Sequence, residues 1–104
     1  MRPGARARRR ADANQPAMVK FIRGLGATFQ HTHSIPGALD GILGYWGIDV
    51  RVEFKDPEKP RSARKLTPAE VETISTWQGR RPVIIETEED VLKVLKELKL
   101  AREL

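Results

Sequence analysis

The chain has 104 residues, no cysteine and a net charge of +5, and its 39% apolar content suffices for one small globular domain. The lack of cysteine excludes disulfides and zinc sites built on thiolates. No apolar stretch is long enough to cross a bilayer, and no hydrophobic segment follows the arginine-rich start, so we expect a cytoplasmic protein with no membrane partner.

The positive charge is concentrated in two segments. Residues 1–15 contain five arginines and one acid, and residues 55–65 contain five basic and two acidic side chains. Charge gathered in this way suits a polyanionic partner such as DNA or RNA. For the N-terminal segment, a role in solubility is an equally good interpretation.

The N-terminal part of the chain divides into an arm and a helix. Residues 1–11 are rich in Arg and Ala without apolar periodicity, which is typical of a disordered basic arm, and we expect residues 12–104 to form a single domain. Pro16 suits the first position of a helix. Four apolar residues then recur at the spacing of one buried helical face, namely Met18, Phe21, Ile22 and Leu25.

Three strands are expected next, at residues 27–33, 39–46 and 49–55, and their short connections favour an antiparallel meander. The last two strands are joined by a turn around Gly47. The following segment, residues 56–65, has two prolines and few apolar residues, so it is expected to be a basic loop.

The C-terminal third predicts two helices separated by a strand. A capping box, Thr67-Pro68-Ala69-Glu70, begins a helix that ends at Gly79 and directs Val71, Ile74 and Trp77 inward. Residues 82–85 form a short buried strand, and Thr87 begins a final helix whose apolar stripe is Val91, Val94, Leu95 and Leu98. The resulting α-β-β-β-α-β-α order predicts an α/β fold with a mixed central sheet flanked by helices.

Two acids and a lysine form a candidate catalytic group. Because side chains alternate along a strand, Glu53 and Lys55 share one face, and the hairpin returns them toward Asp40. Adjacent carboxylates repel unless a cation lies between them, and such hard oxygen ligands favour Mg²⁺ or Mn²⁺. By itself an acid-x-lysine pair often forms only a surface ion pair. The prediction therefore depends on its combination with Asp40 and the basic loop.

The spacing Asp40-x12-Glu53-x-Lys55 resembles the motif of the PD-(D/E)xK nuclease superfamily, which includes many restriction endonucleases and the archaeal Holliday junction resolvases. Five segments also occur in the order seen in small phage-type nucleases similar to the VRR-NUC group, at residues 10–15, 39–43, 52–56, 65–70 and 82–85. The family usually has proline before the aspartate, where this chain has Leu39. That proline shapes the backbone and supplies no ligand.

The resemblance implies a restriction-endonuclease-like core and a Mg²⁺- or Mn²⁺-dependent endodeoxyribonuclease. Asp40, Glu53 and the backbone carbonyl of Phe54 would bind the metal, and Lys55 would orient the attacking water. Gln15 matches the polar residue that faces the metal from the first helix in many members, although it could equally cap that helix. The resemblance further implies a phage-encoded homodimer that acts on branched or structured DNA in the host cytoplasm.

Two other functions are consistent with the sequence. A nucleic-acid-binding module could keep the fold without cleavage, and Leu39 in the proline position motivates this alternative. A subunit of a larger complex could instead dock through an exposed tryptophan or the last helix.

Several side chains outside the catalytic group are candidates for binding. The basic ones would contact DNA phosphates without reading sequence, or form a merely solvated surface, and they are Arg8, Arg9, Arg10, Lys59, Arg61, Arg64 and Lys65. Two imidazoles on one side of a strand, those of His31 and His33, could share a metal or lie at an exposed edge near phosphate. The aromatic side chains of Tyr45, Trp46 and Trp77 could stack on bases or serve a core or interface.

Overall fold

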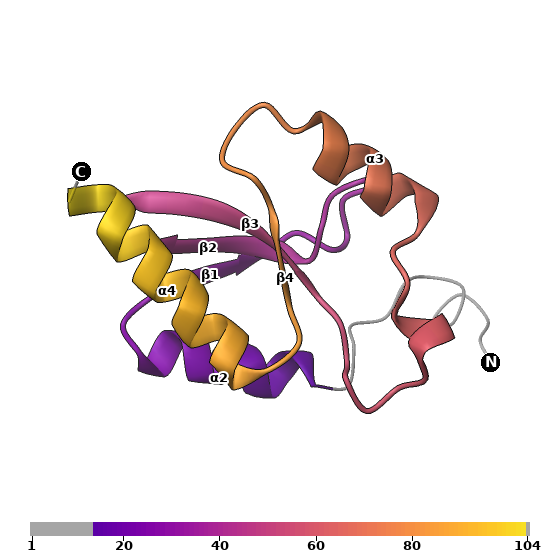
Figure 1. Ribbon diagram of the computed structural model, residues 1–104, viewed down its shortest axis with the longest axis horizontal. Helices are drawn as coiled ribbons and strands as arrows, with labels where there is room; N and C mark the ends of the chain where they lie inside the picture. The colour runs from indigo at the N-terminus through magenta and orange to yellow at the C-terminus, as the bar shows by residue number, and fades with distance from the viewer. Residues whose placement is uncertain (1–13, 104) are drawn as a thin grey trace.

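The computed structural model describes residues 14–103, which form an α/β fold with one four-stranded mixed sheet and three α-helices (Figure 1). The helices are α2 (Gln15–Gly24), α3 (Pro68–Thr76) and α4 (Glu88–Glu103), and a short 3-10 helix, η1 (Arg61–Arg64), precedes α3. The strands are β1 (Thr28–His31), β2 (Gly41–Tyr45), β3 (Ile48–Phe54) and β4 (Val83–Ile85). The α/β class and the mixed sheet agree with the prediction from the sequence.

The sheet has the spatial order β1-β2-β3-β4. The first three strands form the predicted antiparallel meander, and β4 runs parallel to β3. Trp46 and Gly47 connect β2 to β3 with positive φ angles of 53° and 82°. Two consecutive positive φ values match the two-residue turn that suits the twist of a hairpin, which explains the glycine at the second position.

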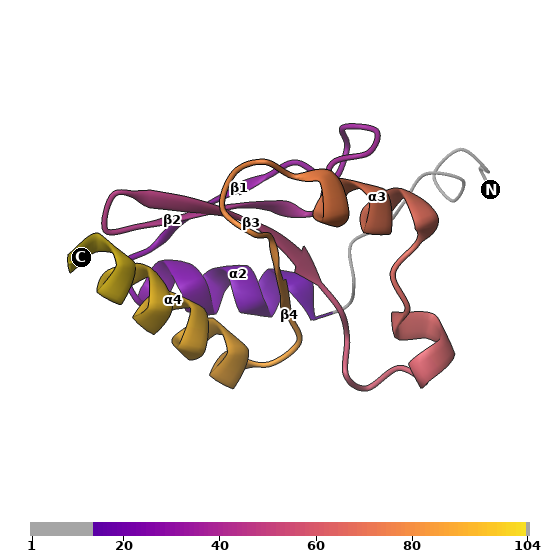
Figure 2. The same ribbon diagram turned by 45° about the horizontal axis from the view of Figure 1, so that its top comes forward.

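Helices α2 and α4 cover one face of the sheet, as Figure 2 shows. The core lies between these helices and the strands, and the predicted stripe of α4 is confirmed, because Val91, Val94, Leu95 and Leu98 are all buried. In α2 the buried residues are instead Gln15, Val19 and Ile22, with Met18 and Phe21 only partly buried beside them. Leu25 is 38% exposed, so its predicted burial is wrong. The helix ends at Gly24, and Leu25 no longer follows the helical face.

Helix α3 lies on the opposite side of the sheet (Figure 2). Its capping box is confirmed, since Thr67 Oγ1 accepts from the Glu70 N–H and Glu70 Oε1 accepts from the Thr67 N–H. Of the predicted inward face, Ile74 is half-buried, but the prediction is wrong for Val71 and Trp77, which are 49% and 39% exposed. The helix also ends at Thr76 rather than at Gly79. Its one buried residue is Glu70, so α3 packs through a charged side chain instead of an apolar stripe.

Some of the sequence predictions fall on parts of the chain that the structure does not describe. The basic arm of residues 1–11, with Arg8, Arg9 and Arg10, lies outside the described residues. Within residues 14–103, no helix has the length and apolarity needed to span a membrane.

Candidate active site

Asp40 is held by the backbone just before β2. The Thr32 N–H donates to the Asp40 carbonyl at 2.8 Å, and Thr32 Oγ1 donates to the Leu39 carbonyl at 2.7 Å. The side chain of Asp40 is 6% exposed, and its Oδ2 accepts from the Phe54 N–H at 2.8 Å. The carboxylate of Asp40 is therefore attached directly to the strand that carries Glu53 and Lys55.

Glycine is required at position 41, next to this aspartate. A Cβ atom there would clash with the ring of Phe29 and lie 2.6 Å from the Gln30 carbonyl oxygen. Since nine in ten Cβ contacts in real structures are longer than 3.4 Å, a side chain at Gly41 would push β1 away from β2. The absence of a side chain thus lets Thr32 and Asp40 approach each other.

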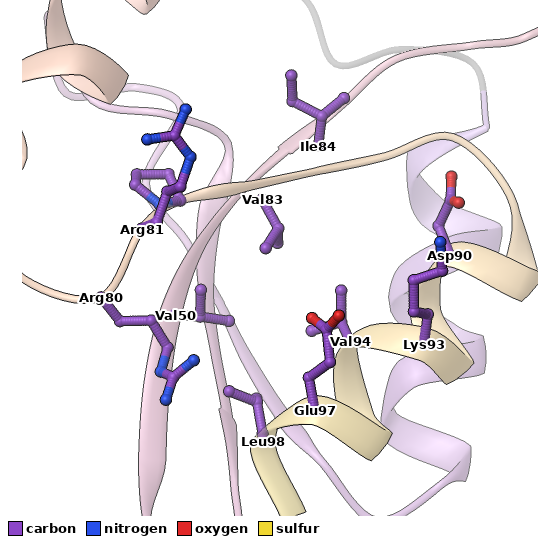
Figure 3. A pocket seen from close by; sticks show the side chains of 11 residues that line it. Val50, Arg80, Arg81, Val83, Ile84, Asp90, Lys93, Val94, Glu97 and Leu98 are labelled. Carbon is purple, nitrogen blue, oxygen red and sulfur yellow. The ribbon is translucent and has the colours of Figure 1, made fainter. Parts of the chain in front are cut away.

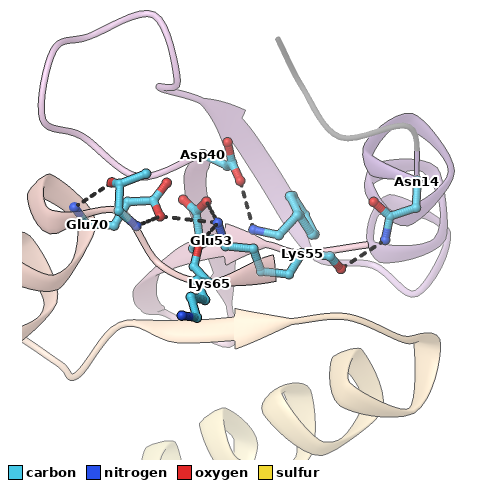
Figure 4. Close-up of polar contacts among 8 residues, drawn as sticks. Asn14, Asp40, Glu53, Lys55, Lys65 and Glu70 are labelled. Atoms are coloured by element: carbon cyan, nitrogen blue, oxygen red, sulfur yellow. Dashed lines mark hydrogen bonds and ion pairs between the residues drawn. The ribbon is translucent and has the colours of Figure 1, made fainter. Parts of the chain in front are cut away.

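Glu53 and Lys55 point to the same side of β3, as the alternation of the strand predicts (Figure 4). Lys55 Nζ lies 3.4 Å from Glu53 Oε2, and both side chains are largely removed from solvent, with 12% and 4% of their areas exposed. The register of the hairpin pairs Gly41 with Val52, so Asp40 lies beside the end of β3 that carries Glu53. The three residues predicted as a catalytic group are therefore brought together.

Glu70 joins this group, although the sequence suggested only a capping role for it. Its Oε1 accepts from Lys55 Nζ at 3.2 Å and from the Thr67 N–H at 2.9 Å (Figure 4). The Glu70 carboxylate thus caps the N-terminus of α3 and also binds Lys55, the lysine of the site. The signal in the sequence was the position of the capping box, directly after the basic loop that leaves β3.

Burial raises the pKa of Glu53 to about 9, with further contributions from the charge of Asp40 and the hydrogen bond to Glu70. Burial would also raise the pKa of Glu70, but the Thr67 N–H and the hydrogen bonds from Glu53 and Lys55 outweigh it and lower that pKa. These effects favour a proton on Glu53 over one on Glu70.

The pKa of Lys55 is raised, because hydrogen bonding and charge from Glu70, followed by Glu53, outweigh the effect of burial. Lys55 is thus a permanent cation at neutral pH, and Glu70 is its charged partner. Lys55 contacts both Glu53 and Glu70, and a divalent cation beside these groups would add positive charge that favours ionised Glu53 next to Asp40.

The donor atoms fit a hard divalent cation. Glu53 Oε1 is buried and has no hydrogen-bond partner within the described residues. The Phe54 N–H donates to Asp40 Oδ2, and a role for the Phe54 carbonyl as a further ligand stays a prediction. Within residues 14–103, no three His, Asp or Glu side chains are grouped to hold a metal. A site of two carboxylates and one carbonyl would leave the other positions of Mg²⁺ to water and substrate.

The first helix contributes two polar residues near these strands. Asn14 Nδ2 donates to the Lys55 carbonyl at 3.3 Å. Gln15 is 1% exposed, its Nε2 lies 3.4 Å from His31 Nδ1, and its Oε1 has no hydrogen-bond partner among the described residues. Asn14, not Gln15, is the N-cap residue of α2, and its side chain makes no capping bond. A role for Gln15 at the metal stays a prediction.

His31 and His33 lie close together at the edge of the sheet formed by β1. Their ring centroids are 5.7 Å apart in an edge-to-face arrangement, and His31 also meets Phe29 edge to face at 5.3 Å. His31 is exposed and His33 is half-buried. Both interpretations of the pair, as metal ligands or as an edge near phosphate, stay open.

The basic loop lies between β3 and α3. Lys59, Arg61 and Lys65 are exposed, whereas Arg64 is half-buried and pairs with Glu86 at 3.4 Å. Lys55 Nζ lies 3.4 Å from the Lys65 carbonyl, so the backbone of the loop contacts the lysine of the site. Arg64 is consequently a weaker candidate for binding phosphate than the three exposed cations.

A hollow of the described surface lies apart from the group of acids. It has a volume of about 390 Å³ and lies between β4 and α4, where Arg80, Arg81 and Lys93 surround an apolar floor (Figure 3). Asp40 and Glu53, at 6% and 3% exposure, do not line it. We identify the site by its chemistry, because the hollow is lined by charges of both signs, Arg80, Arg81 and Lys93 beside Asp90 and Glu97.

No known family model matches this chain, and neither the curated proteins nor the solved structures contain a match. A function is therefore inferred from the residues of the chain itself.

Proposed function

We propose that this chain is a Mg²⁺- or Mn²⁺-dependent endonuclease that hydrolyses DNA phosphodiester bonds, as the PD-(D/E)xK nucleases that it resembles do. The observation that carries the proposal is the gathering of Asp40, Glu53 and Lys55 at the end of two paired strands, where the buried Glu53 Oε1 has no hydrogen-bond partner among residues 14–103. Buried ionisable groups with strongly shifted pKa values are typical of functional sites.

Asp40, Glu53 and the Phe54 carbonyl would hold the metal. When bound, such an ion polarises a phosphate oxygen and lowers the pKa of a coordinated water. Lys55 is protonated, so it stabilises negative charge on the phosphate and orients the water by donating hydrogen bonds, and it does not act as a base. Glu70 fixes the position of the Lys55 ammonium through the contact at 3.2 Å.

The charge of the neighbouring loop supports a nucleic acid as substrate. Lys59, Arg61 and Lys65 are exposed next to the strand that bears the catalytic group. Cations of this kind neutralise backbone phosphates and position a strand without reading its sequence. Branched or structured DNA as the target, the restriction-endonuclease-like core and the homodimer are proposed from the resemblance alone.

Cleavage of a four-way junction and of a linear duplex in Mg²⁺ tests the proposal. Asp40→Asn and Lys55→Ala should each reduce the rate by at least about 100-fold, because each removes a group that stabilises the transition state. Glu97→Gln is the control, because Glu97 is an exposed acid of α4, which covers the other face of the sheet. Full activity of either site variant, in protein with wild-type circular dichroism, would rule out this mechanism.

A nucleic-acid-binding module without cleavage is the second candidate. The observation that favours it is the burial of Glu53, which is 3% exposed and already has a cation, Lys55 Nζ, 3.4 Å from its carboxylate. Calorimetric titration with Mn²⁺ separates the two candidates. Heat of binding that disappears in Asp40→Asn supports the nuclease, whereas salt-dependent DNA binding without any metal heat supports the module.

A further inference from the structure

We propose that the surface walled by Trp77 and Arg51 binds an unpaired nucleobase and its phosphate beside the catalytic group. This inference rests on the proposed nuclease function and names the part of the substrate that lies next to the cut. Trp77 follows the last residue of α3, and its indole is 39% exposed. The Arg51 guanidinium lies over that indole, 4.1 Å from the ring centroid.

Arg51 connects this surface to the acids. It precedes Glu53 by two residues on β3, so both side chains are on the same face of the strand. Two residues of a strand span about 7 Å, a distance that a single nucleotide can bridge. A strand with its phosphate at Glu53 and Lys55 can therefore place the adjacent base against Trp77.

Two hollows flank the Arg51–Trp77 pair. The larger, of about 360 Å³, lies between α3 and residues 35–39, and it reaches Leu39, the neighbour of Asp40. Its volume falls in the usual range for small-molecule sites. The smaller, of about 270 Å³, is lined by Ile42, Asp49 and Arg80 in addition to the pair. We assign the base to the larger hollow and its phosphate to the arginines.

The residues of the larger hollow suit a base. Thr73 Oγ1 donates to the Gly37 carbonyl at 2.7 Å, which fixes the 35–39 loop against α3. Glu72 and Thr76 supply acceptor and hydroxyl groups at the wall, while Trp77, Ile35 and Pro36 supply apolar surface. The Glu72 carboxylate would repel a phosphate, and this repulsion favours the orientation with the phosphate at Arg51.

The charges favour a nucleic acid over an apolar protein surface. No ion pair involves Arg51 or Arg80 in the described part of the chain. Unpaired arginines would be costly at the centre of an apolar protein interface, but phosphates neutralise them. Aromatic rings interleaved with arginines are also the usual platform for single-stranded nucleic acid.

Tryptophan fluorescence tests the assignment directly, because the chain has only two tryptophans. In a Trp46→Phe background, Trp77 is the sole tryptophan, and it can be excited selectively over Tyr45. Titration with a deoxythymidine 12-mer in EDTA should quench its fluorescence, whereas an abasic 12-mer with the same phosphates should quench it much less. Trp77→Ala should weaken binding of the 12-mer by about 5- to 100-fold, the range expected for loss of one base stack, and Trp77→Phe should retain most of it.

Trp46 is the matched control, since it is 45% exposed and also carries a cation, Lys99 Nζ, 4.6 Å from its ring centroid. Trp46→Phe should leave affinity unchanged. Equal quenching by the two oligonucleotides, unchanged affinity in Trp77→Ala, or a lack of binding would each overturn the inference. Quenching that depends on protein concentration alone would also overturn it and would assign the surface to a second copy of the chain. The experiment contains no divalent metal, so loss of cleavage and loss of base binding are separate outcomes.

Discussion

One face of the sheet is apolar and the other is charged, and β3 contributes side chains to both faces. Val50, Val52 and Phe54 point from this strand into the core beneath α2 and α4. The residues between and after them, Arg51, Glu53 and Lys55, alternate to the face on which α3 lies. One face of the sheet therefore supplies the apolar burial that stabilises the fold. The other face carries partly buried charged side chains, which hydrophobic packing alone would not favour.

The comparison explains why α3 lacks an apolar stripe. A helix that sealed the second face with Val71 and Trp77 would cover the charged groups of β3, but these two side chains are exposed and Glu70 is the residue that turns inward. The main apolar cluster consequently lies on the first face, beneath α2 and α4. Sites of this kind are often maintained at the expense of stability elsewhere in a protein.

Substitution of two adjacent isoleucines of β4 should give the largest difference in stability between the two faces of the sheet. Ile85 is fully buried in the core, whereas Ile84 is 43% exposed. Ile85→Ala should lower the free energy of unfolding by about 2–5 kcal/mol through lost contacts and a cavity, while Ile84→Ala should change it by about 0.5 kcal/mol or less. Urea unfolding of the two variants measures this directly. Equal losses would mean that both faces of β4 are packed.

The sequence predicted the elements of the apolar face better than those of the charged face. The stripe of α4 could be predicted because Val91, Val94, Leu95 and Leu98 follow a period that only a buried helical face explains. Val71, Ile74 and Trp77 also follow such a period, yet two of them are exposed. Periodicity indicates which residues share a side of a helix, but tertiary packing decides whether that side is covered.

The candidate site was also predictable from the sequence only where local rules decide the structure. The proximity of Asp40, Glu53 and Lys55 could be predicted from the sequence, because hairpin geometry and the alternation of side chains along a strand are local rules. Glu70 could not be found in this way, since its contact with Lys55 spans 15 residues and depends on how α3 returns to the sheet. The capping box fixed the backbone of Glu70 but gave no information about its partner.

Glu53→Gln should show that the charged face reduces stability. A carboxyl with a folded-state pKa of about 9, compared with 4.5 in the unfolded chain, holds its proton only in the folded state between those values. Stability should therefore fall as pH rises from about 4.5 to about 9. The amide introduced by this substitution cannot ionise, so without divalent metal the variant should melt higher than wild type, by roughly 4–8 °C if the gain is about 1 kcal/mol.

The difference in Tm between Glu53→Gln and wild type should be small at pH 5 and grow toward pH 8, as thermal unfolding in EDTA would show. Comparison at each pH removes the contributions of the titrating groups that do not contact Glu53. A Tm difference that shrinks with rising pH would contradict the protonated state of Glu53. Metal should reverse the order of the two proteins, because only wild type has the carboxylate to bind it.

The capping boxes of α3 and α4 give the smallest expected difference in stability between the two faces of the sheet. Thr67 caps α3 by accepting the Glu70 N–H at 3.1 Å, and Thr87 caps α4 by accepting the Asp90 N–H at 3.1 Å. Loss of such a cap costs about 1 kcal/mol. Because α4 is part of the core and α3 is not, Thr87→Ala should lower global stability by this amount. Thr67→Ala should instead promote local opening of α3.

Hydrogen exchange distinguishes these outcomes residue by residue. In Thr67→Ala, the amides of α3 should exchange about 5-fold faster, the factor that corresponds to roughly 1 kcal/mol, while the amides of β2 and α4 should keep wild-type rates. In Thr87→Ala, the slowest amides of the sheet should accelerate instead. If Thr67→Ala accelerated the core amides equally, α3 would unfold together with the core, and the two faces would form one cooperative unit rather than a stable frame carrying a separable site.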